Sequence, residues 1–309
     1  MRECRIAPLS PRAAGGDAEG RGGLPCTPSH PRGYQRACRT MPLETQNRGR
    51  EAATMSNGYT ESTIEVAGLP IEVRRGGDGP SVLVIHHETG NPGWLEFHDA
   101  LSAQRDVILP TLPGWDGTER GDWMRSVRDI AAVCSLLLDE LGVGDATVVG
   151  LGFGGYIAAE MATANQSRLS GLVLVNAMGI QPEDGEIRDQ FLEAHADYVK
   201  SCFADPANFT ALYGEEVSTE QLVAWDANRE MTARTAWKPF LYSQTLPHLL
   251  PNVKTPTRIV RGTGDTVVPA TAANQYVALL GDAELIEIAG GHNLESDAPE
   301  ALAEAIVAS

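Results

Sequence analysis

The chain lacks the features that mark several protein classes. It holds five cysteines in 309 residues, with no CxxC pair, so a disulfide framework is not expected. Its apolar runs stay well short of the roughly 18 residues that a bilayer-spanning helix needs. No charged-then-apolar leader opens the sequence, which favours a cytoplasmic protein.

Convincing cofactor motifs are also missing. The glycine-rich run Gly150–Gly155 has GxGxxG spacing, but it is better explained by a tight strand-to-helix turn than by phosphate binding, and no P-loop lysine follows it. His98, His195 and His248 show no HExxH-like spacing. From these spacings we expect no cofactor and no metal.

Basic residues are scarce outside the first part of the chain. The net charge is −17, and residues 1–54 carry nine Arg against five acidic residues, which leaves −21 for residues 55–309. A strongly acidic body repels phosphate backbones and anionic lipid. We therefore expect small-molecule partners, with no nucleic acid and no membrane; the oligomeric state is not determined by the sequence.

The chain divides into a tail and one domain. Residues 1–54 are rich in Gly, Pro and Arg without apolar periodicity, which predicts a disordered tail. Met55 is a possible internal start, so the tail is interpreted as an over-extended gene start. The alternative, an Arg-rich targeting peptide, fits poorly with its acidic residues and prolines.

Residues 55–309 alternate strand and helix patterns. Strands are expected at 63–66, 71–74, 81–87, 106–109, 146–149, 172–176, 257–261 and 284–288, and helices at 94–103, 127–141, 154–163, 271–280 and 299–307. The first two strands suggest a hairpin, and the later alternation is typical of parallel strands joined by crossover helices. The prediction is an α/β domain with a mostly parallel eight-stranded sheet.

A long insertion interrupts this alternation at about residues 180–250. It holds nine of the chain's eighteen aromatic residues, and it is too long for a simple loop. We interpret it as a helical lid that walls an apolar pocket over the carboxyl edge of the sheet, with Trp237 in the pocket wall. The simpler alternative is that most of these aromatics only pack the insertion onto the sheet.

Three glycine-rich turns suggest a family. Gly150-Leu-Gly-Phe-Gly154 joins a strand to a helix, Gly262-Thr-Gly-Asp265 follows a late strand, and Gly290-Gly-His292 follows the last strand. In this order, together with the turns His86–Gly90 and Leu112–Gly117, they resemble the α/β-hydrolase family and its lidded members. The resemblance covers the whole body.

The resemblance implies specific site residues. Asp265 and His292 match the family's acid and base, whereas Gly152 stands where the GxSxG elbow has its nucleophilic serine. The backbone N–H groups of Glu88 and Phe153 match the oxyanion hole. Residues at the pocket edge would be His87 and Asn176, although Asn176 alternatively caps its strand end.

Glu88 departs from the family pattern. A carboxylate beside an oxyanion hole would repel the developing charge, so either Glu88 turns outward or the site serves another chemistry. Burial in an apolar pocket would raise its pKa and make it a protonated donor. Alternatively, His87 and Glu88 are polar loop residues that face solvent.

Three functions remain open. The first is an enzyme in which His292, held by Asp265, acts as a general base on a small apolar ester, lactone or diketone-like C–C substrate without a serine nucleophile. The second is a catalytically silent ligand-binding or regulatory protein. The third is a lyase or isomerase that uses Glu88 and His292 as an acid/base pair.

Overall fold

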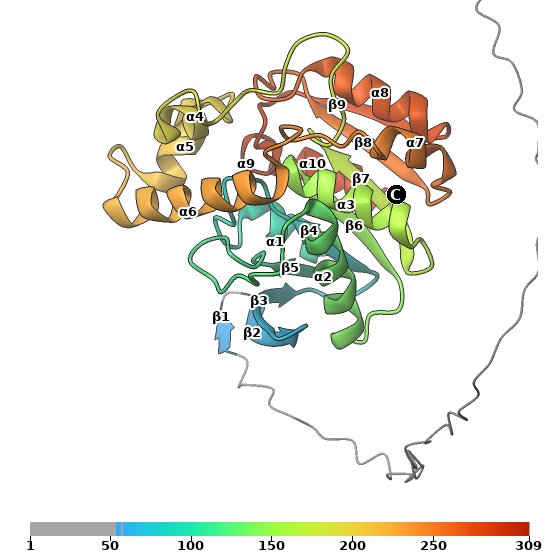
Figure 1. The fold of residues 1–309 in the computed structure, drawn as a ribbon. Coiled ribbons are helices and arrows are strands. Elements are labelled where there is room, and N and C mark those ends of the chain that lie inside the picture. Colours follow the sequence, from blue (N-terminus) through green and yellow to red (C-terminus); the bar gives the residue numbers. More distant parts are fainter. Residues whose placement is uncertain (1–53, 57, 309) are drawn as a thin grey trace, which may run out of the picture. The chain divides into compact units, whose positions relative to one another are not determined.

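The described chain folds around a single twisted sheet. The structure, a computed structural model, describes residues 54–56 and 58–308. Residues 1–53 of the predicted disordered tail lie outside the described residues, whereas Thr54, its last residue, belongs to a strand. The strand order is β1-β2-β3-β5-β4-β6-β7-β8-β9 (Figure 1). The strands are β1 (Thr54–Ser56), β2 (Tyr59–Val66), β3 (Leu69–Gly76), β4 (Ser81–Ile85), β5 (Asp106–Pro110), β6 (Ala146–Leu151), β7 (Leu169–Val175), β8 (Thr257–Gly262) and β9 (Glu284–Ile288).

Eight of these strands are those predicted, and β1 adds three residues at the edge. The pair β2 and β3 is an antiparallel hairpin, and β3 pairs antiparallel with β5. All pairings from β5 through β4 to β9 are parallel. β4 and β6 have no exposed residue, as expected for strands covered on both faces, whereas β2 alternates between partly buried and exposed positions.

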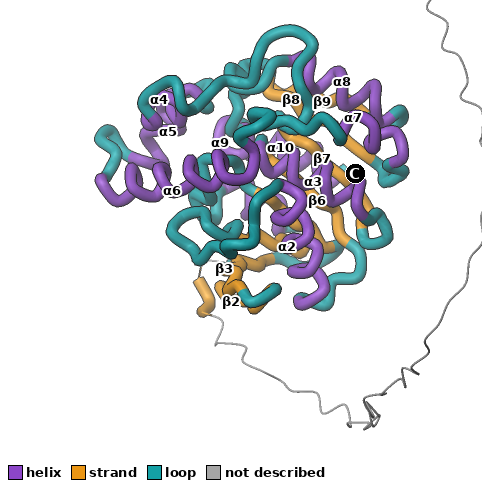
Figure 2. Tube along the Cα trace, in the orientation of Figure 1, coloured by secondary structure: helices purple, strands orange, loops and turns teal. Residues whose placement is uncertain are grey.

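Helices cover both faces of the sheet (Figure 2). They are α1 (Glu96–Ser102), α2 (Val127–Glu140), α3 (Phe153–Ala164), α4 (His195–Ser201), α5 (Pro206–Tyr213), α6 (Thr219–Ala236), α7 (Leu246–Leu249), the 3₁₀ helix η1 (Leu250–Asn252), α8 (Ala270–Leu280), α9 (Leu294–Asp297) and α10 (Pro299–Val307). Successive residues of a strand point to opposite faces. Accordingly, Val82 and Val84 pack with α1 and α10, whereas Leu83 and Ile85 pack with α2 and α3.

The strand order places a crevice beside β4. The chain goes from β4 to β5 on one side and then crosses to β6 on the other. Where the winding direction reverses in this way, the loops at the carboxyl ends of the strands separate, and ligands bind there in open α/β sheets. The turns that follow β4 and β6 therefore form the expected location of a site.

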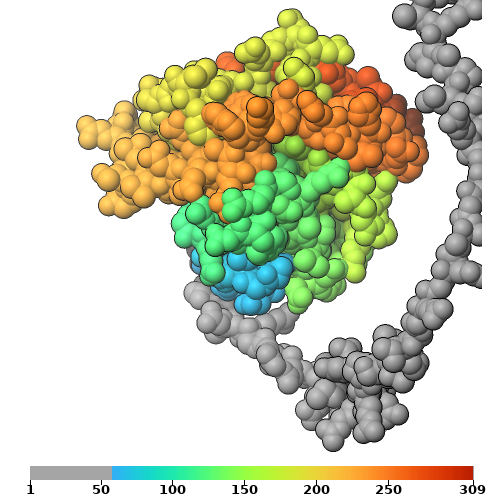
Figure 3. Space-filling model, viewed as in Figure 1, coloured from blue at the N-terminus to red at the C-terminus, as the bar shows by residue number. Residues whose placement is uncertain are grey.

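The predicted insertion is helical and docks on these turns. Asn228 of α6 donates to Thr89 O at 2.8 Å and accepts from Asp116 N at 2.8 Å, and Arg234 donates to Met124 O at 3.1 Å. Figure 3 shows the insertion, yellow to orange, lying against the green part of the chain. Among the described residues, no helix is both long and apolar enough to cross a bilayer.

His98 gives the fold a measurable pH dependence. Its ring is buried in α1, its Nδ1 accepts from Leu95 N at 2.9 Å, and burial lowers its pKa to about 3. Between pH 6.5 and 3 the unfolded chain takes up a proton at this ring that the folded chain does not. This histidine should therefore lower the free energy of unfolding by up to about 1.4 kcal/mol for each pH unit below 6.5.

The measurement is urea unfolding at several pH values between 7.5 and 5, for wild type and His98→Gln. The glutamine keeps an acceptor for Leu95 N but does not titrate, so the variant should lose less stability on acidification. Identical slopes in the two proteins would show that His98 does not remain neutral in the folded chain.

Candidate functional site

The turn between β6 and α3 has a backbone that suits glycine. Gly152 has φ +53° and ψ −109°, its N–H donates to Val175 O at 2.9 Å, and its carbonyl accepts from Met178 N at 3.0 Å. A Cβ on Gly154 would lie 2.1 Å from Ile85 O, so helix and strand can approach only because this residue has no side chain. The backbone of the turn between β6 and α3 therefore has the sharp, strained conformation of a strand-to-helix elbow.

The space beside Gly152 is partly occupied. A Cβ at this position would lie 2.4 Å from His87 Nδ1 and 2.7 Å from His292 Nε2. Both rings are buried, and each is fixed by a carboxylate. A side chain at position 152 would therefore require both imidazoles to move.

The structure brings Asp265 and His292 together. Asp265 Oδ2 lies 3.0 Å from His292 Nδ1, while its Oδ1 accepts from Val267 N at 2.7 Å and Val268 N at 3.0 Å. Their side chains are 2% and 0% exposed. The carboxylate thus fixes the ring orientation and directs Nε2 towards Gly152.

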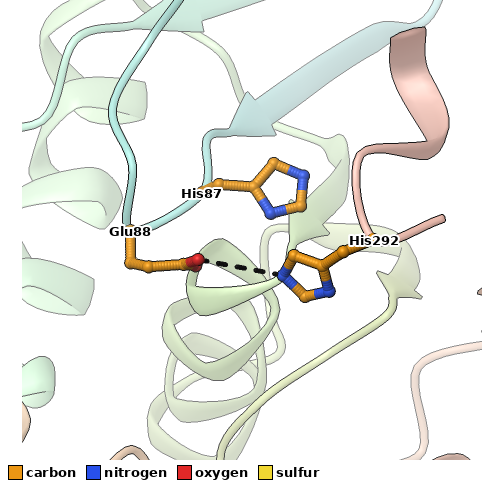
Figure 4. Close-up of side chains that lie close together, drawn as sticks. All are labelled: His87, Glu88 and His292. Carbon is orange, nitrogen blue, oxygen red and sulfur yellow. Dashed lines mark ion pairs between the residues drawn. The ribbon is translucent and has the colours of Figure 1, made fainter. Parts of the chain in front are cut away.

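Glu88 points into the protein, which contradicts the solvent-facing interpretation. Its side chain is 0% exposed, and its Oε1 accepts from the Tyr198 hydroxyl at 2.8 Å and lies 3.9 Å from His292 Nε2 (Figure 4). Of the two possibilities drawn from the sequence, the structure therefore rules out the outward-turned carboxylate.

His87 is buried against His292, so its solvent-facing interpretation is also wrong. The ring centroids are 4.8 Å apart. His87 Nε2 lies 3.2 Å from Glu295 Oε2, and both side chains are 3% exposed. Glu295 was missed by the sequence reasoning, as was the contact of Tyr198 with Glu88; the one available signal was an acidic residue three positions after His292.

Glu88 and His292 shift each other's pKa. Burial disfavours a charged His292, but the carboxylates of Asp265 and Glu88 outweigh it and raise its pKa to about 10. Burial likewise favours a neutral Glu88, but the contact with His292 lowers its pKa to about 2, contrary to the raised value considered from the sequence. At neutral pH His292 is therefore the proton donor of the pair and Glu88 the acceptor.

The remaining predicted residues have different surroundings. Asn176 Nδ2 donates to the carbonyls of Gly291 and His292 at 3.0 and 2.9 Å, and its Oδ1 accepts from Gly262 N at 2.8 Å. Its side chain thus positions the loop of His292 instead of lining a pocket.

Trp237 and Phe153 lie apart from the cluster's polar contacts. Trp237 is 54% exposed and packs on Phe191 and Phe240. The Phe153 ring is buried beside Trp115. Its backbone N–H begins α3, where N–H groups lack intrahelical partners, and with that of Glu88 it stays a predicted oxyanion-hole donor.

Three side chains of the cluster satisfy the geometry of a cation site. His87, Glu88 and His292 each offer one ligand atom within 4.8 Å of the others. The sequence search by spacing could not find this group, because two of the three residues are adjacent in the chain and the third lies 204 positions after Glu88.

Comparisons with known proteins agree on one family. A model of the alpha/beta hydrolase family matches residues 82–305. A hydrolase of 2-hydroxy-6-oxononadienedioate and 2-hydroxy-6-oxononatrienedioate from Burkholderia vietnamiensis is 27% identical over 76% of this chain and 88% of its own. Polyketide synthase ThaQ of Burkholderia thailandensis is 30% identical over 80% of this chain, which spans only 13% of that synthase.

Solved structures confirm the predicted fold class. The carbazole-degradation serine hydrolase CarC superposes with a TM-score of 0.67 at 21% identity, covering 81% of this chain and 98% of that one. The meta-cleavage product hydrolase CumD of Pseudomonas fluorescens gives 0.66 at 21% identity, covering 80% and 96%. At this identity the likeness establishes the fold alone.

The crowding at Gly152 leads to a stability prediction. Gly152→Ser should destabilise the protein by roughly 1–3 kcal/mol, because the new Cβ overlaps fixed imidazole nitrogens. The same substitution in a His87→Gly background should cost clearly less, and thermal or urea unfolding of the four proteins measures this coupling.

Gly144→Ser is the matched control, since a Cβ there meets nothing within 4 Å. If the cost of Gly152→Ser were the same with and without His87, the imidazole would not be what excludes a side chain.

Proposed function

The chain belongs to the alpha/beta hydrolase family, and on that premise we propose that it hydrolyses a small apolar ester, lactone or C–C bond beside a carbonyl. Water attacks directly in this proposal, and no acyl-enzyme forms. The observation that carries it is a glycine at the elbow that faces a buried cluster of acids and imidazoles.

The surroundings of Gly152 support a mechanism without a covalent intermediate. An acyl-enzyme on serine or cysteine requires a hydroxyl or thiol that can reach the carbonyl carbon. Ser135 donates to Ala131 O within α2, and Ser167 lies in the exposed turn after α3. Cys202 is buried, burial raises its pKa well above the ordinary value, and its thiol donates to Tyr198 O.

Proton transfer falls to Glu88 and His292 in this proposal. Glu88 Oε2 has no hydrogen-bond partner among the described residues and accepts the proton of the attacking water. The His292 imidazolium donates its Nε2 proton to the leaving group, and Asp265 keeps the ring oriented. Positioned acid/base catalysis contributes roughly 10²–10⁴-fold, which suits an already reactive bond.

This assignment changes the first sequence-based hypothesis, in which His292 was the base. Two neighbouring carboxylates hold its pKa at about 10, so a neutral imidazole is not the form present near pH 7. The pairing of Glu88 with His292, first considered for a lyase or isomerase, supplies the acid and the base of the hydrolysis.

The insertion serves as a lid in the same proposal. Tyr198 of α4 donates to Glu88 and is fully buried, so α4 closes the cluster from the insertion side. Substrate entry therefore requires a movement of α4. Relatives named as a hydrolase of an oxo-dienedioate, as a putative carbamate hydrolase and as a methyl ester esterase support small carbonyl substrates.

The test is turnover of activated esters, lactones and a chromogenic diketone by wild type, Glu88→Gln and His292→Ala. Each variant should lower kcat by at least about 10²-fold, because each removes one partner of the proton transfer. His248→Ala is the control, since this exposed residue of α7 lies outside the cluster.

Mass spectrometry of quenched reactions should show no acyl adduct on wild type. An adduct that accumulates during turnover would contradict direct water attack. Absence of turnover together with ligand binding that survives His292→Ala would favour the silent binding protein instead.

A further inference from the structure

We propose that His87, Glu88 and His292 bind a divalent first-row transition metal ion of the Zn²⁺ type. Three atoms of this cluster have no hydrogen-bond partner among the described residues: His87 Nδ1, Glu88 Oε2 and His292 Nε2. All three side chains are at least 97% buried. Buried polar atoms are rarely left unpaired, and the three residues place one ligand atom each within 4.8 Å of the others.

The other polar atom of each proposed ligand side chain contacts a second polar group. His87 Nε2 lies 3.2 Å from Glu295 Oε2, and His292 Nδ1 lies 3.0 Å from Asp265 Oδ2. Glu88 Oε1 accepts from the Tyr198 hydroxyl at 2.8 Å. Imidazoles that bind metals commonly donate their other N–H to a carboxylate, which fixes the tautomer and aims the free nitrogen at the ion.

Gly152 leaves room for the ion. The point where its Cβ would stand lies 2.4 Å from His87 Nδ1 and 2.7 Å from His292 Nε2. Zn–N bonds are about 2.0–2.1 Å long. The Cβ point itself is one bond length from Gly152 Cα and too close for an ion, so an ion would lie farther from the backbone, between the two rings, after a shift of their nitrogens. Any side chain at position 152 would occupy the same space.

The charge of the cluster favours a cation. Glu88, Asp265 and Glu295 are buried carboxylates, and their ion pairs within the described chain are with imidazoles alone. Buried charge is costly unless it is compensated. With both histidines protonated, the three carboxylates leave one negative charge, and a dication beside neutral histidines leaves the same one negative charge, so the cluster accommodates an ion as well as it accommodates two protons.

The donor set narrows the class of ion. Two imidazole nitrogens and one carboxylate suit Zn²⁺ and its first-row neighbours, whereas Mg²⁺ and Ca²⁺ prefer oxygen ligands. Three protein ligands leave a position for water. This proposal departs from the expectation of no metal, which rested on histidine spacing along the chain.

The use of the ion rests on the proposed hydrolysis, whereas its binding does not. Bound water would lose a proton at lower pH than free water. In the metal-bound form Glu88 and His292 would be ligands and would no longer transfer the protons directly; the bound hydroxide would add to the carbonyl carbon, the bond to the leaving group would break, and the leaving group would take up the proton that the water released.

The experiment uses the full chain without a polyhistidine tag, freed of metal with a chelator. Zn²⁺ binding is measured by equilibrium dialysis with elemental analysis, and Co²⁺ binding by visible absorption. Wild type should bind one ion, and His87→Ala and His292→Ala should each weaken binding by more than about 100-fold. His248→Ala should bind like wild type. All the variants keep Cys4, Cys26, Cys38 and His30, so metal binding by the first 54 residues would be the same in each of them.

Glu295→Gln tests the positioning of His87 without removing a ligand. It should weaken Zn²⁺ binding by about 10- to 100-fold, with the melting temperature of the metal-free protein little changed. Zn²⁺ should also raise the melting temperature of wild type but not of His87→Ala.

Binding that is equally strong in wild type, His87→Ala and His292→Ala, or absent from all three, would overturn the metal site. Hydrolysis by the metal-free protein would leave the proposed function standing and would show that the ion takes no part in the reaction. A bound ion without turnover of any substrate would do the reverse.

Discussion

The contact between Gly152 and the two imidazoles is the constraint on which the site depends. The left-handed turn brings its backbone against His87 Nδ1 and His292 Nε2, at distances too short for any Cβ. Because Gly154 allows α3 to approach Ile85 closely, the turn cannot withdraw to make room. The absence of a side chain at position 152 and the position of His87 are therefore linked: the ring of His87 lies in the space that such a side chain would need.

This constraint also explains the charge of the cluster. An imidazole held against the elbow requires its own hydrogen-bond partner, and Glu295 supplies it from α9. Glu88, the next residue in the chain, then lies inside the protein with only Tyr198 and His292 to compensate it. Three carboxylates are thereby buried within one small volume. Such an arrangement is stable only if positive charge resides among them, as protons on the imidazoles or as a bound cation.

Much of the fold followed from the sequence, because periodicity and glycine placement are local signals. The continuous apolar run at 81–85 and the three- and four-residue spacing in 127–141 predicted β4 and α2 closely. The resemblance of the Asp265 and His292 turns to the family's acid and base implied their pairing, and the strands that they follow, β8 and β9, are parallel neighbours in the sheet. These inferences needed no knowledge of side-chain direction.

The other contacts of the site depend on where the side chains point, which the sequence pattern does not give. Whether Glu88 faces solvent or the core depends on the conformation of the loop after β4, and His87 and Glu295 meet across 208 positions of the chain. Histidine spacing could not reveal a cation site assembled from an adjacent pair and a distant third residue. A search for glycine at a nucleophile position, combined with a second imidazole at the oxyanion turn, is the sequence pattern that these contacts suggest, because each residue sterically requires the other.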